Sequence, residues 1–223
     1  GDTFVKQVGG AELNVAVGAA LLGLHTGVIS KLPAHDIGSF MKGKIRSFGV
    51  SDDFFMYDQS SAARVGIYYY ENGAYPRKPK VIYDRNHSSF FSLDIDEIPE
   101  EVYTASKCFH TTGITLALNG DIRETTIEMI KRFKAAGTLV SFDVNFRGNL
   151  WTGDQARECI LRILPYVDIF FCSEDTARLT FLKTGTAREM MKSFTEEFPI
   201  SIVASTQRIV HSPKRHTFGS VIY

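Results

Sequence analysis

The sequence has no excess of charge of either sign, because its 25 lysine and arginine residues equal its 25 aspartate and glutamate residues. A balanced chain gives nucleic acid or an anionic membrane surface no electrostatic advantage, so a small-molecule partner is favoured. No apolar run approaches the roughly 18 residues of a membrane span. The first residues also lack the charged and apolar regions of a secretion signal. We therefore expect a cytoplasmic protein without a nucleic-acid or membrane partner.

Cysteine is scarce as well. Cys108, Cys159 and Cys172 are odd in number and widely spaced, which indicates no metal site. Cys108 and Cys172 fall within segments that resemble strands, where thiols are most often buried and inert. This usage favours a reducing compartment.

Strand-like and helix-like segments alternate along most of the chain. Strands are expected at 26–32, 107–110, 139–142, 168–172, 200–205 and 220–223, and helices at 13–24, 36–48, 123–136, 154–164, 174–183 and 188–198. Strands that alternate with helices of this length form a largely parallel sheet covered on both faces. The sequence thus predicts an α/β fold, and 223 residues suffice for one such domain with or without a smaller appendage.

Residues 62–91 depart from this alternation. Two β-rich segments, ARVGIYYYEN and KPKVIYDRN, occur here without a following helix. They predict an antiparallel lid on an α/β domain formed by residues 1–61 and 92–223. Alternation sends Tyr68 and Tyr70 to one face and Tyr69 to the other, so at least one of them should pack within the protein. The edges and apolar face of a small exposed sheet predict a homo-oligomer, most simply a dimer, formed through the lid.

The segment DVNFRGNLW places Asp143, Asn145 and Arg147 directly after a predicted strand. Ligands of open α/β sheets bind beyond the carboxyl ends of the strands. The planar guanidinium of Arg147 suits bidentate pairing with a carboxylate or phosphate. In the structural alternative, Asp143 caps the next turn and Arg147 pairs with it on the surface.

Gly9 and Gly10 open a helix whose first turn carries Glu12 and Asn14. Adjacent glycines let a ligand approach the backbone closely, and a helix N-terminus offers unpaired N–H groups. A tight turn from strand to helix would use the same two glycines.

The longer run GGAELNVAVGAALLG, at 9–23, precedes the β-rich segment and DVNFRGNLW in the order found in the ribokinase/PfkB family of carbohydrate kinases. The chain resembles that family over nearly its whole length. The resemblance implies a Rossmann-like, ribokinase-like α/β/α sandwich with a small β-sheet lid. It also implies transfer of the γ-phosphoryl group of ATP, with Mg²⁺, to a sugar hydroxyl. Within the family, the GGAExN and DxNxRxxLW motifs and an aromatic-x-Arg on the lid are most similar to 2-keto-3-deoxygluconate kinases.

The resemblance also implies roles for particular residues. Arg147 would meet the carboxylate of the substrate, since a 3-deoxy-2-keto acid differs from a neutral sugar chiefly by its charge. For Arg85, a surface role is an open alternative, because exposed arginine is the usual case. His110 is expected to be a core or supporting residue, and Gly113 to end a strand near the pocket. The implied substrate-binding set is Gly10, Asn14, Tyr68, Tyr83, Arg85, Asn145 and Arg147.

The residues expected to bind the nucleotide match the family less well. Ser173 stands where the family commonly has asparagine, and Thr176 replaces a glutamate that helps to organise Mg²⁺ and phosphate. Alternatively, Ser173 caps the next helix. Ser205, Thr206 and Arg208 follow a predicted strand where the family begins its ATP-binding segment. With Ser173, they are the predicted nucleotide-binding residues.

Phosphoryl transfer needs a base for the hydroxyl proton and donors for the charge on the transferring phosphate. The family takes both from a Gly-rich GAGD-type segment near the C-terminus, and the sequence contains no such segment. The family's first strand, ahead of Gly9, is missing or short. We therefore assign no catalytic base and expect a sequence that lacks both ends of the fold. A kinase of 2-keto-3-deoxygluconate is the leading hypothesis. The alternatives are a kinase of fructose or a nucleoside, and a protein that binds a sugar acid without phosphorylating it.

Overall fold

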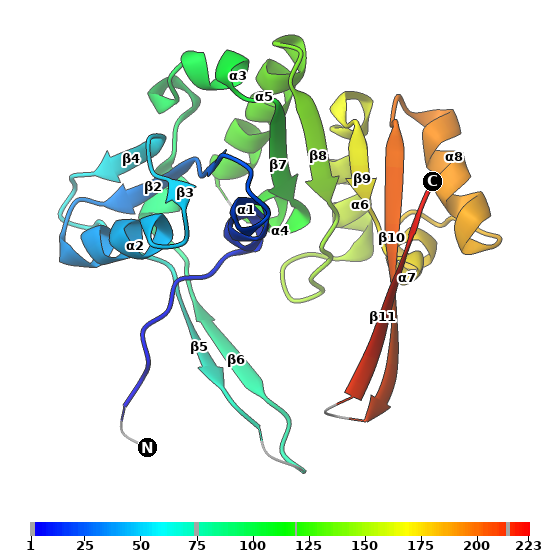
Figure 1. Ribbon diagram of the computed structural model, residues 1–223, viewed down its shortest axis with the longest axis horizontal. Coiled ribbons are helices and arrows are strands. Elements are labelled where there is room, and N and C mark those ends of the chain that lie inside the picture. Colours follow the sequence, from blue (N-terminus) through cyan, green and yellow to red (C-terminus); the bar gives the residue numbers. More distant parts are fainter. Residues whose placement is uncertain (1–2, 74–75, 119, 213–214) are drawn as a thin grey trace. The chain divides into compact units, whose positions relative to one another are not determined.

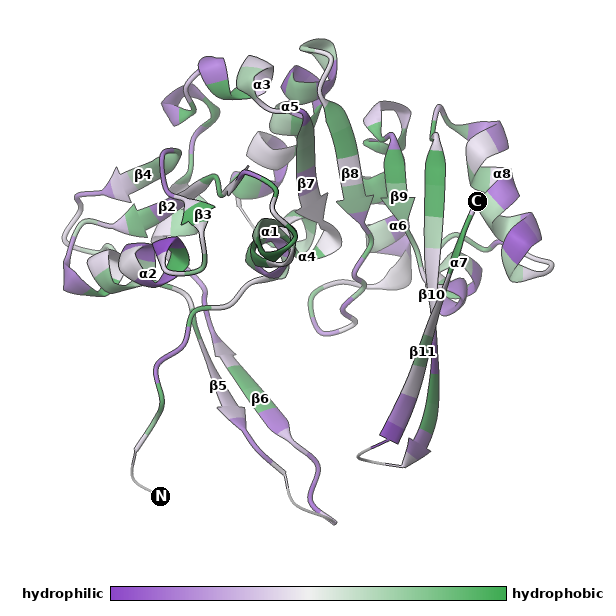
Figure 2. Ribbon diagram, in the orientation of Figure 1, coloured by the Kyte–Doolittle hydropathy of each residue, from purple (hydrophilic) through white to green (hydrophobic). Residues whose placement is uncertain are grey.

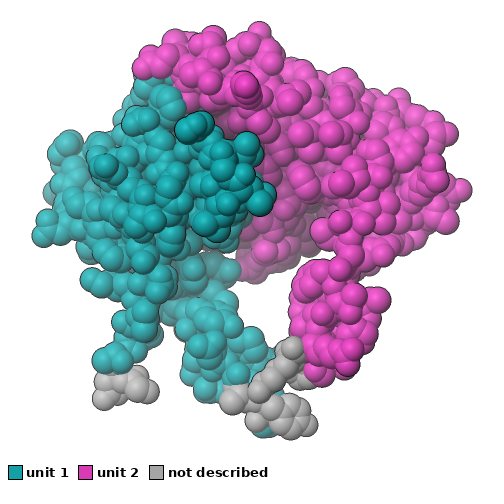
Figure 3. All heavy atoms as spheres, in the orientation of Figure 1, with its two compact units in different colours: residues 1–99, 119–122 teal, residues 100–118, 123–223 magenta. Residues whose placement is uncertain are grey.

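The computed structural model describes residues 3–73, 76–118, 120–212 and 215–223. The chain divides into two compact units (Figure 3). The first comprises residues 1–99 with 119–122, and the second comprises residues 100–118 with 123–223. Both units alternate helices with strands (Figure 1), which confirms the predicted α/β class. None of the helices in the described part of the chain is long and apolar enough to span a membrane.

The first unit is built from short, paired strands. β1 pairs with β3 and β2 with β4 in parallel, whereas β5 and β6 form an antiparallel hairpin. Its core brings together Leu13, Ile45 and Phe55, from α1, α2 and β4. The elements are α1 (Ala11–Leu21), β1 (Thr26–Gly27), β2 (Ser30–Pro33), α2 (Asp36–Arg46), β3 (Val50–Ser51), β4 (Phe55–Asp58), β5 (Ile67–Glu71), β6 (Lys80–Asp84) and the 3-10 helices η1 (Ser89–Ser92) and η2 (Ile95–Glu97).

The structure corrects the single strand predicted at 26–32. That segment forms two strands, β1 and β2, each with a different partner: Thr26 pairs with Val50, and Ser30 pairs with Phe55. The partner strands β3 and β4 were not predicted. Both are too short for a clear alternation of apolar and polar residues. The predicted antiparallel hairpin is confirmed.

The second unit holds a five-stranded sheet in the order β11-β10-β9-β8-β7, in which β7 to β10 are parallel and β11 is antiparallel. Figure 2 shows the apolar residues of β8, β9 and the start of β10 in green. The elements are α3 (Glu101–Ala105), β7 (Cys108–Thr112), α4 (Gly113–Ala117), α5 (Ile122–Ala135), β8 (Leu139–Asp143), α6 (Gly153–Leu161), the 3-10 helix η3 (Leu164–Tyr166), β9 (Ile169–Phe171), α7 (Glu174–Leu179), α8 (Ala187–Glu197), β10 (Ile202–Ser212) and β11 (Arg215–Ile222).

Aromatic rings fill the core on one face of this sheet. Phe170 of β9 lies 4.9 Å, between ring centroids, from Phe194 of α8 and 6.4 Å from Phe142 of β8. Phe109 of β7 stacks on Phe133 of α5 at 4.2 Å. Parallel register places Phe109, Phe142 and Phe170 on the same side, so α5 and α8 pack on one shared apolar face.

Two further predictions about the second unit are wrong. The strand expected at 200–205 extends to Ser212, and its partner begins at Arg215 instead of residue 220. Strands β10 and β11 pair through their backbones from Ala204–Ile222 to Ser212–Arg215. Their side chains beyond Ser205 are mostly exposed, so the sequence there shows little apolar pattern. Cys108 is exposed, because it begins β7 at the edge of the described sheet, whereas Cys159 and Cys172 are buried.

Two glycines of helix α2 give opposite expectations for the same substitution. A Cβ at Gly38 would lie 2.0 Å from the carbonyl oxygen of Pro33, whereas a Cβ at Gly43 would meet nothing within 4 Å. Gly38→Ala should therefore lower the free energy of unfolding by about 1–3 kcal/mol, the usual cost of overpacking. Gly43→Ala should raise it by about 0.5–1 kcal/mol, because alanine favours a helix interior. Urea unfolding measures both, and changes of the same sign would contradict this contrast.

Candidate functional site

The N-terminus of α1 lies against the hairpin residue Tyr68. Gly10 precedes the helix in an extended conformation, and its carbonyl accepts a hydrogen bond from the Asn14 N–H at 2.9 Å. A Cβ at Gly9 would lie 2.6 Å from the Tyr68 hydroxyl oxygen, whereas one at Gly10 would make ordinary contacts. A larger residue at position 9, which was not in the predicted set, would therefore displace the Tyr68 side chain. The double glycine in the sequence was the signal that could have identified it.

Three predicted residues of the hairpin come together. Tyr68 pairs with Tyr83 across the strands, with ring centroids 6.2 Å apart. The guanidinium carbon of Arg85 lies 4.6 Å from the centroid of the Tyr83 ring. Tyr69 packs edge-on against Phe4, although both side chains are exposed. Tyr68, Tyr83 and Arg85 form an aromatic surface that carries a positive charge.

Arg85 is electrostatically unusual. It is half-buried, and this burial lowers the pKa of its guanidinium. No hydrogen bond or ion pair of its side chain is found within residues 3–73, 76–118, 120–212 and 215–223. A partly desolvated cation without a carboxylate partner gains free energy when an anion binds to it. Arg85 is therefore a candidate anion-binding residue.

The segment after β8 contains the predicted group Asp143, Asn145 and Arg147. Asp143 Oδ1 accepts a hydrogen bond from the Asn145 N–H at 2.9 Å, and Asn145 has a left-handed φ of 39°. Asp143 therefore caps the turn, as the structural alternative proposed. Arg147 is exposed, and its Nη1 donates to the carbonyl of Phe146 at 3.0 Å. This bond leaves most of the guanidinium N–H groups available to a ligand.

Gly113 fixes the neighbouring turn at the end of β7. It begins α4, which Thr112 caps by accepting a hydrogen bond from the Ile114 N–H at 3.2 Å. A Cβ at Gly113 would lie 2.1 Å from the carbonyl oxygen of Val144. Glycine at this position thus lets the start of α4 lie directly against the segment that leads to Asn145. His110 of β7 is half-buried, with Nδ1 2.9 Å from Ser141 Oγ, as expected for a supporting residue.

The predicted nucleotide residues are not gathered on one surface. Ser173 caps α7, because its Oγ accepts the Thr176 N–H at 3.2 Å. Ser205, Thr206 and Arg208 lie within β10 instead of after it, and alternation places Ser205 on the face opposite to the other two. The distances from Arg208 Nε and Nη2 to His216 Nδ1 are 3.1 and 3.0 Å.

Ser205 is 3% exposed and lines a small cavity with Met190, Met191 and Phe194. Its Oγ has no hydrogen-bond partner in the described part of the chain. The described residues also contain no group of three His, Cys, Asp or Glu side chains that could hold a metal ion.

A comparison with protein families gives a direct match. The model of the pfkB family carbohydrate kinases matches residues 1–207, which is most of the chain. The chain belongs to the pfkB family of carbohydrate kinases. The members of this family are phosphotransferases, and the α/β fold of this chain is similar to that of a solved pfkB family carbohydrate kinase.

The chain is similar to pfkB relatives named as kinases of sugar acids. It is 33% identical to a 2-dehydro-3-deoxygalactonokinase of Haloferax volcanii over 97% of this chain and 67% of that protein. It is 32% identical to a 2-dehydro-3-deoxygluconokinase of Bacillus subtilis over 70% of this chain and 47% of that protein. The chain thus spans between about half and two thirds of the length of these relatives.

Solved structures agree with this assignment. The crystal structure of a 2-dehydro-3-deoxygluconokinase from Thermotoga maritima is 29% identical, with a TM-score of 0.92 over 100% of this chain and 69% of that chain. A fructokinase from Xylella fastidiosa with bound ATP is 21% identical, with a TM-score of 0.77 over 94% of this chain and 65% of that chain. The second likeness shows the pfkB fold alone.

Proposed function

We propose that this pfkB protein is an ATP-dependent kinase of a 2-keto-3-deoxy sugar acid, with 2-keto-3-deoxygluconate as the predicted substrate and its 6-phosphate as the product. The observation that carries the proposal is Arg85, a half-buried cation without an anionic partner in the described chain. A carboxylate on the substrate gives this cation a partner, whereas a neutral sugar does not. The names of the Haloferax volcanii and Bacillus subtilis relatives support an acidic sugar as the substrate.

The proposed roles of individual residues are supported by their positions within each unit. Tyr68 and Tyr83 offer hydroxyls and ring faces to the sugar beside the start of α1, where Gly10 and Asn14 would meet its hydroxyl groups. Residues 62–91 would act as a lid and also mediate dimerisation, since both strands of the hairpin are exposed. In the second unit, Asn145 and Arg147 stay the proposed sugar-acid-binding residues.

ATP is the predicted phosphoryl donor, and Mg²⁺ is the predicted metal ion that would neutralise its phosphates. Ser173, Ser205, Thr206 and Arg208 stay the proposed nucleotide-binding residues. Arg208 is the best placed of them to meet a phosphate, since it is exposed on β10. No residue of the chain is assigned as the base, and the protein is predicted to act in the cytoplasm.

The proposal is tested by measuring ADP formation by the full-length protein. The substrates are 2-keto-3-deoxygluconate, its galactonate epimer and fructose, each with ATP and Mg²⁺. We expect kcat/KM for one of the two acids to exceed that for fructose by on the order of 100-fold, because a neutral sugar leaves the half-buried Arg85 cation unpaired. A preference for fructose would refute recognition of an acid. Calorimetric binding of the acid without ADP formation would instead indicate a sugar-acid-binding protein.

A further inference from the structure

A second arginine, Arg64, closes the base of the β5–β6 hairpin. It lies in the segment that leads from β4 into β5, opposite Ser89 of η1. The Ser89 N–H donates to the Arg64 carbonyl at 2.8 Å, and the Arg64 N–H donates to Ser89 Oγ at 3.2 Å. The β5–β6 pairing ends at Ile67 and Asp84. These two hydrogen bonds therefore join the entry segment, which leads into β5, to the exit segment, which follows β6, beyond that end of the hairpin.

The Arg64 guanidinium holds the two residues that flank Arg85. Its Nη1 donates to the carbonyl of Asn86 at 3.0 Å. Its Nη2 lies 2.8 Å from Asp84 Oδ2 and 3.4 Å from the Asp84 carbonyl oxygen. The rigid fork of a guanidinium thus fixes the backbone on both sides of Arg85.

Arg85 also packs closely against Gly66 at the start of the hairpin. A Cβ at Gly66 would lie 3.1 Å from the Cβ of Arg85, so glycine at this position allows close approach of the two segments. The Ser88 N–H donates to the Arg85 carbonyl at 3.3 Å. The backbone of Arg85 is therefore held from both sides of the hairpin base, while its side chain lies over Tyr83.

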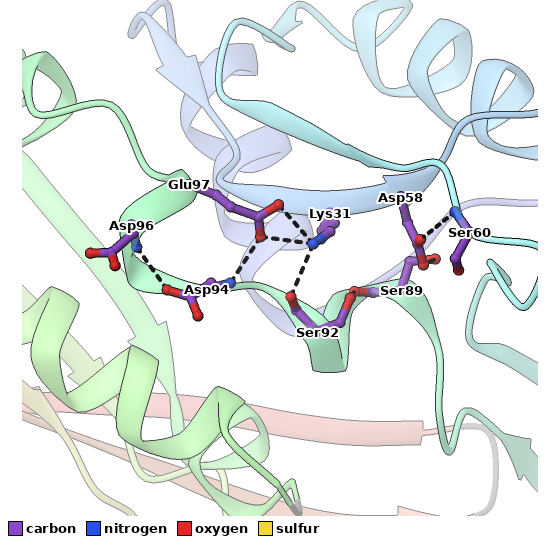
Figure 4. Close-up of polar contacts among 8 residues, drawn as sticks. All are labelled: Lys31, Asp58, Ser60, Ser89, Ser92, Asp94, Asp96 and Glu97. Carbon is purple, nitrogen blue, oxygen red and sulfur yellow. Dashed lines mark hydrogen bonds and ion pairs between the residues drawn. The ribbon is translucent and has the colours of Figure 1, made fainter.

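The exit segment is also anchored to β2 and to the end of β4 (Figure 4). Asp58 Oδ2 accepts a hydrogen bond from Ser89 Oγ at 2.8 Å, and hydrogen bonds from Ser60 and Ser89 lower the pKa of Asp58. Lys31 Nζ donates to the Ser92 carbonyl at 3.0 Å and to the Glu97 carboxylate at 2.7 Å. The segment that Arg64 contacts is therefore itself held in place by hydrogen bonds within the first unit.

We propose that Arg64 is a positioning residue that holds Arg85 in the orientation that binds the substrate carboxylate. The inference rests on the proposed role of Arg85. Without Arg64, residues 84–86 would gain conformational freedom, and binding would have to restore their order. The loss should therefore fall on substrate affinity and not on the chemical step.

The experiment compares the KM for the sugar acid, the KM for ATP and kcat in the full-length protein and its variants. Arg64→Ala should raise the KM for the acid on the order of 10-fold, with the KM for ATP and kcat unchanged. The matched control is Arg77→Ala, because Arg77 pairs with Glu71 on the same hairpin at 3.0 Å and has no contact with residues 84–86 in the described chain. This control should leave all three constants unchanged.

A double-mutant cycle separates positioning from general damage. In an Arg85→Ala background, Arg64→Ala should raise the KM for the acid no further, because the residue that it positions is gone. Equal increases in both backgrounds would overturn the inference. An unchanged KM in Arg85→Ala alone would instead refute the proposed role of Arg85. Should Arg64→Ala fail to fold, Asp84→Asn, which removes the charge facing Arg64, should raise the same KM, and an unchanged value would overturn the inference.

Discussion

Arg147→Ala should lower kcat/KM for the 2-keto-3-deoxy sugar acid by about 30- to 900-fold, which corresponds to about 2–4 kcal/mol of transition-state binding. The physical reason is the loss of a charge-assisted pair between a guanidinium and the substrate carboxylate. The side chain is exposed and bonds to the carbonyl of Phe146, so its removal should cost little folding stability. Steady-state kinetics of the full-length enzyme, together with thermal unfolding, measure both effects.

Two variants control this experiment. Arg147→Lys keeps the charge but loses the planar fork, so its kcat/KM should lie between those of the native protein and the alanine variant. Arg188→Ala removes another exposed arginine, in the first turn of α8, and should change neither kcat/KM nor the melting temperature. An unchanged kcat/KM in Arg147→Ala would exclude Arg147 from carboxylate recognition.

Phe170→Ala should lower the free energy of unfolding by about 3–5 kcal/mol, the usual cost of removing a buried phenylalanine ring. Phe170 is 0% exposed and contacts three other rings. Their centroids lie 4.9 Å away for Phe194, 6.0 Å for Phe181 and 6.4 Å for Phe142. The cavity left by the missing ring would separate β9 from α8. Since proteins are stable by only about 5–15 kcal/mol, this loss is a large share of the total.

The adjacent residue provides a matched control. Phe171 has the same side chain on the opposite face of β9 and is 37% exposed. Phe171→Ala should therefore lower the free energy of unfolding by only about 1 kcal/mol. Urea unfolding at neutral pH compares the two variants directly. Equal losses would show that the aromatic cluster on the helical face is not the main core of the sheet.

The sequence alone predicted the helices and strands whose pattern of residues lies within a single segment. Helices α5 and α8 follow apolar residues at helical spacing, and both were expected within a few residues of their observed limits. The β5–β6 hairpin was expected because two β-rich segments follow each other without a helix. The two functional motifs, at 9–23 and 143–151, indicated the carbohydrate kinase family that the comparison then showed.

Tertiary structure decided which strands pair and which side chains meet. The division of 26–32 into β1 and β2 depends on separate partner strands, and the length of β10 depends on backbone pairing with β11. The close approach of Gly9 to the Tyr68 hydroxyl joins residues 59 positions apart in the sequence. Arg64 likewise meets Asp84 and Asn86 only because the hairpin folds back on itself. Periodicity reports how each segment is buried, whereas contacts between distant residues depend on pairings that no local pattern specifies.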